Sequence, residues 1–120
     1  MPKVSIVVPN YNHEGFLEKR LQSILDQSFQ DWELIFVDDA STDKSLDIFR
    51  NIAGDPRIRE PLVNKTRSGN ILSQWQKGIG SARGEYIWIA ESDDYADKKF
   101  LQATVGVLDS HKKAGIVYTA

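Results

Sequence analysis

With 120 residues, the chain has the length of one domain, and folding can bury about two-thirds of the surface that the unfolded chain exposes. Its net charge of −2 gives no electrostatic basis for binding nucleic acid, and the absence of cysteine excludes disulfides, thiolate metal sites and cysteine nucleophiles. No segment approaches the ~20 apolar residues of a membrane span, and the N-terminal apolar run is too short for a signal peptide. We therefore expect one domain over residues 1–120 that is cytoplasmic, has no transmembrane segment and binds no nucleic acid.

Strand signals and helix signals alternate along the chain. Short apolar runs bounded by turn residues predict strands near 4–8, 34–37, 58–63, 86–90 and 116–118. Apolar residues at spacings of three and four predict helices over 16–25, 45–53, 68–82 and 98–110. Because apolar strands that alternate with helices form sheets covered on both faces, the sequence predicts an α/β fold with a doubly wound, mostly parallel sheet.

Polar and aromatic residues stand directly after the first two predicted strands. The first strand runs into an uncharged Pro-Asn-Tyr-Asn segment that contains Pro9 and Tyr11. The second strand ends at Asp38 and Asp39, which turn and helix-capping residues follow. Open α/β sheets bind ligands in the crevice beyond the carboxyl ends of their strands, so these residues are candidates for a nucleotide pocket.

The fourth predicted strand runs directly into three carboxylates, Glu91, Asp93 and Asp94, in the sequence IWIAESDDYAD. Clustered carboxylates repel one another and need a partner, most simply a hard divalent cation with oxygen ligands. The alternative is a solvated acidic loop that caps the next helix. Because the acids adjoin the apolar run without a spacer, we favour the ligand site.

These segments together resemble a known family. Residues 4–45 and the later GEYIWIAESDDYAD segment, 84–97, are similar to the N-terminal, nucleotide-sugar-binding half of family 2 glycosyltransferases with the GT-A fold. The resemblance depends on three elements in this order: a strand ending in Pro-x-Tyr-Asn, a strand ending in Asp-Asp-x-Ser-x-Asp, and an acidic Ser-Asp-Asp after strand four. It implies a strand order of 3-2-1-4 with a fifth strand.

The resemblance also implies roles for individual residues. Pro9 and Tyr11 match residues that line the base pocket, and Asp39 matches the acid that accepts a hydrogen bond from a base N–H. Asp93 and Asp94 match the motif that holds Mn²⁺ or Mg²⁺ between the two phosphates of a nucleotide-sugar, so Asp93 also counts as nucleotide-binding.

Three further residues complete the expected site. Arg67 and Lys65, in the loop after strand three, are candidates for phosphate or base contacts. Glu91 stands where the family usually has aspartate, and its longer side chain would contact the ribose or reach the metal through water, if it is not a direct ligand. The family's general base belongs to the acceptor-binding half, so we expect no catalytic residue in this chain.

The implied function is metal-dependent, inverting transfer of a sugar from a UDP-linked donor to a hydroxyl of a glycan or lipid-linked acceptor. One alternative is a nucleotide-binding fragment without turnover. Another is a receiver-like signalling domain, which would need an acid pair after the first strand and a lysine after the last, and the sequence has neither.

The chain ends directly after the fifth predicted strand. We therefore expect a fragment of a longer protein, whose remaining part would carry the acceptor site and could attach the protein to the inner face of the membrane. Apolar residues at 116–118 would remain exposed, which favours homo-oligomers through this side.

Other residues have simpler interpretations. Trp75 and Trp88 are expected to pack between elements, and His13 to be a solvated neighbour of a helix start. The glycine-rich run 78–84 follows a helix and precedes a strand, the reverse of a phosphate-binding loop, so we do not assign it one.

Overall fold

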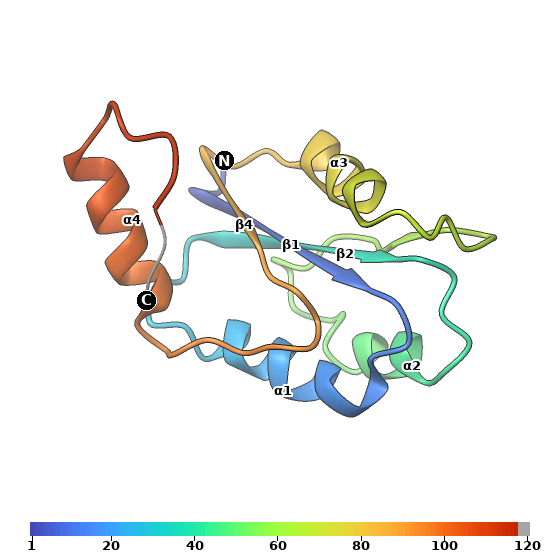
Figure 1. The fold of residues 1–120 in the computed structure, drawn as a ribbon. Coiled ribbons are helices and arrows are strands. Elements are labelled where there is room, and N and C mark those ends of the chain that lie inside the picture. Colours follow the sequence, from blue (N-terminus) through green and yellow to red (C-terminus); the bar gives the residue numbers. More distant parts are fainter. Residues whose placement is uncertain (118–120) are drawn as a thin grey trace.

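The computed structural model describes residues 1–117 as an α/β fold of four strands and four helices (Figure 1). In chain order the elements are β1 (Val4–Asn10), α1 (Glu14–Leu25), β2 (Trp32–Asp38), α2 (Ser45–Arg50), β3 (Leu62–Val63), α3 (Ile71–Ser81), β4 (Tyr86–Ile89) and α4 (Phe100–Ser110). None of the helices in this range has the length and apolar character needed to cross a membrane.

The sheet is parallel, with the strand order β3-β2-β1-β4, as predicted. β1 lies in the middle and pairs with β2 along its whole length, from Val4 opposite Trp32 to Asn10 opposite Asp38. On its other side Val7 pairs with Ile89 of β4. The order reverses between β1 and β4, so a crevice is expected beyond the ends of these two strands.

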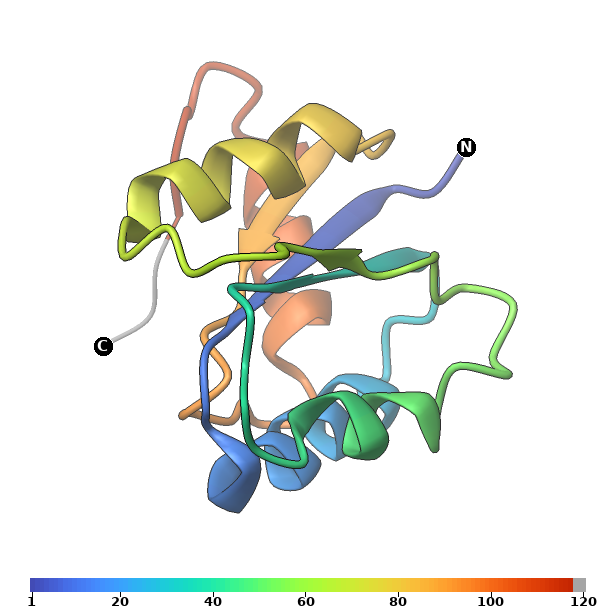
Figure 2. The same cartoon turned by 90° about the vertical axis from the view of Figure 1, so that its right-hand side faces the viewer.

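Successive residues of each strand point to opposite faces of the sheet, and each face has its own apolar core. α1, α2 and α4 pack on one face, where Phe36 of β2 stacks on Phe49 of α2 with ring centroids 4.5 Å apart. α3 lies alone on the other face, over Val7, Ile35 and Val37 (Figure 2). The sheet is therefore covered on both sides, as the apolar strands predicted.

Two strand predictions differ from the structure. The third strand was predicted over 58–63 but spans only Leu62–Val63, with one isolated bridge between Ile58 and Leu34. Leu34 and Val37 of β2 are three residues apart, whereas their partners Ile58 and Leu62 are four apart, so an extra residue interrupts the pairing, as in a bulge.

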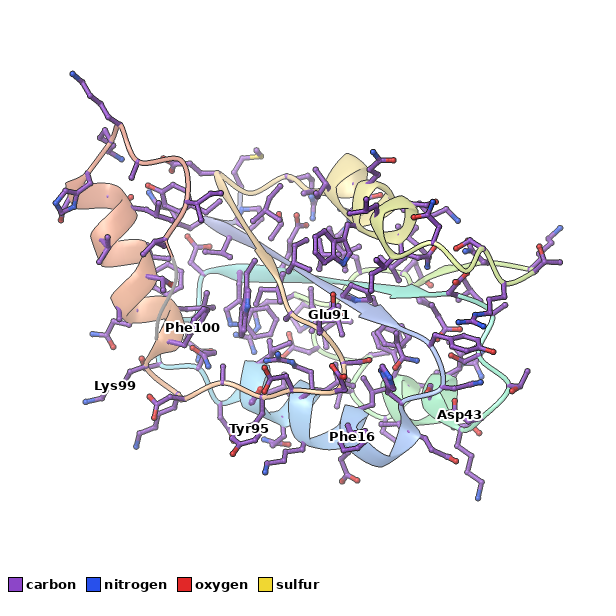
Figure 3. The ribbon with its side chains drawn as sticks, in the orientation of Figure 1. Phe16, Asp43, Glu91, Tyr95, Lys99 and Phe100 are labelled. Atoms are coloured by element: carbon purple, nitrogen blue, oxygen red, sulfur yellow. The ribbon has the colours of Figure 1, made fainter. Side chains whose placement is uncertain are left out.

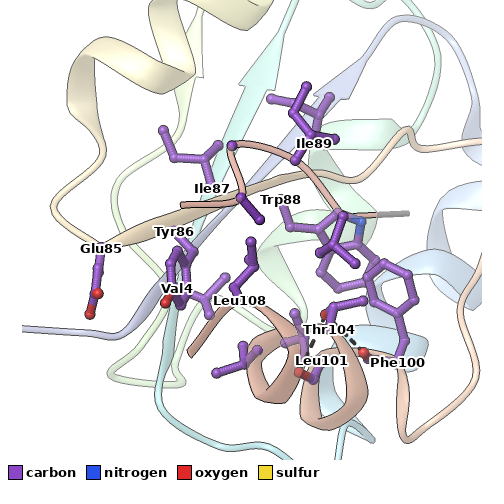
Figure 4. A pocket seen from close by; sticks show the side chains of 15 residues that line it. Val4, Glu85, Tyr86, Ile87, Trp88, Ile89, Phe100, Leu101, Thr104 and Leu108 are labelled. Carbon is purple, nitrogen blue, oxygen red and sulfur yellow. Dashed lines mark hydrogen bonds between the residues drawn. The ribbon is translucent and has the colours of Figure 1, made fainter. Parts of the chain in front are cut away.

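The predicted fifth strand is not present in the described residues. Ile116 and Val117 form no strand, and residue 118 lies outside the described range. Ile116 is 84% exposed, and with Val117 it borders an apolar pocket of about 450 Å³ between β4 and α4 (Figure 4). Homo-oligomer formation through this side stays a prediction.

A buried carboxylate connects the amino-terminal ends of β1, β2 and β4. Glu33 points to the α3 face of β2 and accepts hydrogen bonds from Ser5 Oγ at 2.6 Å and from the backbone N–H of Arg83 at 2.8 Å. The Arg83 side chain also pairs with Glu33, at 3.0 Å. Gly84 follows, where a Cβ would lie 2.6 Å from Ser5 N. The chain therefore enters β4 in one defined position.

Gly78 is required by close packing of α3 on the sheet. A Cβ there would lie 3.0 Å from Val7 Cγ2 and closer still to Cγ1, whereas a Cβ at Gly80 would meet nothing within 4 Å. The glycine that weakens the helix therefore allows it to approach β1.

We predict opposite effects for the two glycines. Gly80→Ala should stabilise the fold by about 1 kcal/mol through helix propensity. Gly78→Ala should destabilise it by about 1–3 kcal/mol because the new methyl group overpacks against Val7. Urea unfolding of the two variants measures both, and equal effects of the two substitutions would contradict this packing.

Candidate functional site

A pocket of about 160 Å³ lies at the carboxyl end of β1, bordered by β2, β4 and the start of α3. Four of the predicted nucleotide-binding residues, Pro9, Tyr11, Asp39 and Arg67, line it together with Glu91. Asp93, the fifth, is exposed in the turn that follows Glu91 and is not part of the lining. The remaining lining residues are Asn10, His13, Gly69, Asn70, Ile71 and Gln74.

Strand alternation separates the two acids at the end of β2. Asp38 is directed to the α1 side, where its carboxylate accepts hydrogen bonds from Ser41 N at 2.8 Å and from Asn10 Nδ2 at 2.9 Å. Asp39 is directed to the α3 side and into the pocket. Ala40, with a φ of 60°, turns the chain immediately afterwards. Asp38, a pocket candidate from the sequence, is thus a structural residue of the turn, and Asp39 is the acid that lines the pocket.

The Asp39 carboxylate binds the loop between β3 and α3. Oδ1 accepts from Asn64 Nδ2 at 2.8 Å and Ser68 N at 2.7 Å, and Oδ2 accepts from Ser68 Oγ at 3.0 Å and Gly69 N at 3.2 Å. Burial would raise the pKa of Asp39, but these hydrogen bonds outweigh it and hold the pKa below its usual value. Asp39 is therefore a charged acceptor with its lone pairs already in use.

The aromatic wall of the pocket is covered by a cation. The Arg67 guanidinium carbon lies 3.9 Å from the centroid of the Tyr11 ring, a cation–π contact between the loop and the end of β1. One face of the Tyr11 ring is thus occupied by a side chain of the same loop that Asp39 holds. Lys65 is exposed and does not line the pocket.

Glu91 faces the pocket but is bound to α3. Its Oε1 accepts a hydrogen bond from Trp75 Nε1 at 2.9 Å. Burial raises the pKa of Glu91, with a further contribution from the charge of Asp93. In Figure 3 Glu91 lies toward the sheet, whereas Tyr95, further along the turn, lies beside α1, where Lys19 Nζ is 3.8 Å from its ring centroid.

Asp93 and Asp94 are both exposed, and neither forms an ion pair within the described residues. No group of three His, Cys, Asp or Glu side chains converges on a metal position within residues 1–117. The Asp94 Oδ1 accepts a hydrogen bond from Tyr95 N at 2.8 Å, and its carboxylate is otherwise open to solvent. Two exposed carboxylates fit Mg²⁺ or Mn²⁺, because such cations commonly take one or two protein carboxylates and complete their shell with phosphate oxygens and water. The donor set thus suits a cation that binds together with a phosphate ligand.

Two residues of the site were missed at the sequence level. His13, expected to be solvated, is partly buried, and its Nδ1 lies 2.6 Å from the Oγ of buried Ser92. Arg20 is buried in α1 and donates from Nε to the backbone oxygen of Glu91 at 2.7 Å. The sequence feature that could have identified Arg20 is a charged residue on the apolar face of its helix, between Leu17 and Ile24.

Solved structures share this architecture. A 1–349 fragment of TarS from S. aureus in complex with UDP-GlcNAc matches with a TM-score of 0.86 and 30% identity, covering 92% of this chain and 32% of that one. The mannosyltransferase PcManGT from Pyrobaculum calidifontis, in complex with GDP-Man and Mn²⁺, matches with a TM-score of 0.80 and 26% identity, covering 89% and 32%.

Sequence relatives agree with these structures. The putative glycosyltransferase EpsE of Bacillus subtilis is 34% identical over 118 residues, which is 98% of this chain and 42% of EpsE. The chain thus spans less than half of this relative's length. The family model described as glycosyl transferase family 2 matches residues 5–120. This match covers nearly the whole sequence, and the chain belongs to glycosyl transferase family 2.

Proposed function

We propose that this chain is the donor-binding part of a metal-dependent, inverting glycosyltransferase that uses a UDP-linked sugar. The observation that carries the proposal is the placement of an aromatic pocket with a charged acceptor, Tyr11 and Asp39, where the strand order reverses, and of two exposed carboxylates, Asp93 and Asp94, in the turn after β4. The similar TarS structures with UDP and UDP-GlcNAc support the choice of UDP.

The base would bind between Tyr11 and Asp39. Its N–H would donate to the Asp39 carboxylate, which already accepts four hydrogen bonds from residues 64–69. A carboxylate offers about four lone-pair positions, so the base must replace one of the present donors. Arg67 must also leave the exposed face of Tyr11 or lie over the base as a second layer. Binding of the nucleotide-sugar therefore includes a rearrangement of the loop between β3 and α3.

The diphosphate would lie toward Asp93 and Asp94. Without a cation it would face these two carboxylates and Glu91, an arrangement of like charges that disfavours binding. When bound there, Mn²⁺ or Mg²⁺ supplies the positive charge that stabilises the departing diphosphate. The two aspartates would hold the cation, whereas Glu91 remains bound to Trp75 and borders the pocket.

In the proposed reaction an acceptor hydroxyl attacks the anomeric carbon, the bond to the nucleoside diphosphate breaks, and the configuration inverts. The described residues are proposed to bind and orient the donor. We expect the general base and the binding site for a glycan or lipid-linked acceptor in the part of the longer family members that this chain does not span.

One prediction of the proposed function concerns Asp39. Asp39→Asn should weaken UDP binding by about 1–3 kcal/mol, because an amide replaces a charged acceptor and adds a mismatched donor. Ser68→Ala is the matched control: it removes only one competing donor, Ser68 Oγ, and should leave UDP affinity unchanged or increase it. Calorimetric titration of UDP measures both variants. Weaker binding in Ser68→Ala together with unchanged binding in Asp39→Asn would refute the assignment of this acceptor.

Another prediction concerns the cation. UDP should bind the unmodified chain more tightly with Mn²⁺ than without it, because the phosphates and the two aspartates share the ion. In an Asp93→Asn/Asp94→Asn double variant this enhancement should disappear, while metal-free binding stays the same or improves.

Glu91→Gln is the matched variant within the same turn. Since the Glu91 carboxylate is bound to Trp75, this variant should retain most of the Mn²⁺ enhancement. An equal loss in Glu91→Gln and in the double variant would show that Glu91 is a metal ligand. A double variant with full Mn²⁺ enhancement would exclude the aspartates as the cation site.

A further inference from the structure

Arg20 occupies a position where α1 otherwise carries core residues. It lies on the same helix face as Leu17, Leu21 and Ile24, and only 4% of its surface is exposed. A buried charge is costly unless hydrogen bonds or opposite charges compensate for it. The groups around Arg20 therefore indicate which part of the structure its charge stabilises.

The guanidinium of Arg20 is hydrogen-bonded to the start of the acidic turn. Nε donates to the Glu91 backbone oxygen at 2.7 Å, and the guanidinium carbon is 5.4 Å from the centroid of the Trp88 ring. Among the described residues, the buried Nη1 has no hydrogen-bond partner. A guanidinium has five N–H donors, so this arginine is bound sparsely for a buried one.

The compensation comes from charge. Burial lowers the pKa of Arg20, whereas the negative charges of Asp94, Asp93 and Glu91 act in the opposite direction. No side chain of the described chain forms a direct ion pair with Arg20. Its charge thus acts on the whole turn.

The atom that Arg20 holds is the one on which the turn closes. The Glu91 backbone oxygen also accepts from Asp94 N, at 3.4 Å. Two other contacts hold the same segment: Trp75 binds the Glu91 carboxylate, and His13 binds Ser92. Arg20 differs from these two because it is the contact that carries a permanent positive charge.

We propose that Arg20 is a positioning residue for the turn 91–94. It fixes the Glu91 carbonyl and offsets the repulsion among Glu91, Asp93 and Asp94, so that the two aspartates are in place before a cation binds. The inference rests on the proposed function for the identity of the cation and of the nucleotide.

A purely structural arginine would behave differently. An apolar residue of similar size can replace a buried charge without loss of stability, and such a replacement would leave the turn unchanged if Arg20 only filled space. The experiment must therefore measure the order of the turn and the effect of the cation on nucleotide affinity, and must separate both from the overall stability of the fold.

The test uses Arg20→Met, which keeps the length but removes charge and donor, and Arg20→Lys, which keeps the charge. In the metal-free chain, amides of residues 92–95 should exchange about tenfold faster in Arg20→Met, while amides of β1 and β2 keep their protection. The Mn²⁺ enhancement of UDP affinity should fall about tenfold, and metal-free UDP affinity should stay within about twofold. Arg20→Lys should be intermediate in both readouts.

Arg57→Met is the matched control. Arg57 also covers a tryptophan, with its guanidinium carbon 3.8 Å from the Trp32 ring centroid, but it pairs with Asp55, far from the turn in the chain. This variant should lose stability without changing either readout.

The possible outcomes separate this inference from the proposed function. Unchanged exchange in the turn and unchanged Mn²⁺ enhancement in Arg20→Met would overturn the role of Arg20 and leave the proposed function intact. If UDP binding to the parent chain shows no Mn²⁺ enhancement, the proposed function fails, and the exchange rates still decide the role of Arg20. If Arg20→Met does not fold, exchange in Arg20→Lys decides: protection equal to the parent overturns the inference.

Discussion

The parallel register of β1 between β2 and β4 is the constraint on which the site depends. Val7 pairs with Ile35 on one side and with Ile89 on the other. β1 and β2 end level, at Asn10 and Asp38, whereas β4 ends at Ile89, opposite Val7, so Glu91 follows a strand that stops three residues earlier. Side chains alternate in phase across such a sheet. Residues beyond the strand ends therefore meet in two sets, one over α3 and one over α1.

The set over α3 forms the pocket. Pro9, Tyr11, Asp39 and Glu91 belong to it, and the close contact of Gly78 with Val7 brings α3 near enough for Trp75 to reach Glu91. The set over α1 includes Ser92, which holds the acidic turn through its contact with His13. The turn is therefore fixed from both faces of the sheet, while the carboxylates of Asp93 and Asp94 remain in water.

Much of this arrangement could be predicted from the sequence, because it follows from local pattern. Apolar runs ending in Tyr11, Asp39 and the acidic segment placed the polar ends at one edge, and the resemblance of these segments to a known family implied the strand order. Partners from distant elements could not be predicted: nothing local to Glu91 indicates Trp75 or Arg20. The third strand was overpredicted because β-type residues around 58–63 do not reveal a register interruption. Of the predicted fifth strand, the described residues Ile116 and Val117 form no strand, because an apolar segment does not by itself form one.

Two carboxylates on one side of the sheet serve the site and the fold separately. Glu33 lies in β2 and Asp39 directly after its end, both directed to the α3 side, six residues and about 20 Å apart. Hydrogen bonds hold the pKa of each below its usual value, despite burial that acts to raise it. A carboxylate with a depressed pKa stabilises the fold above its unfolded-state pKa, and this contribution is lost as the pH falls through the folded-state pKa. Acid would therefore release the pocket loop and loosen the entry to β4, each as the pH falls through the folded-state pKa of its carboxylate, so that a loss of ligand at low pH does not by itself distinguish protonation of the pocket from unfolding of the domain.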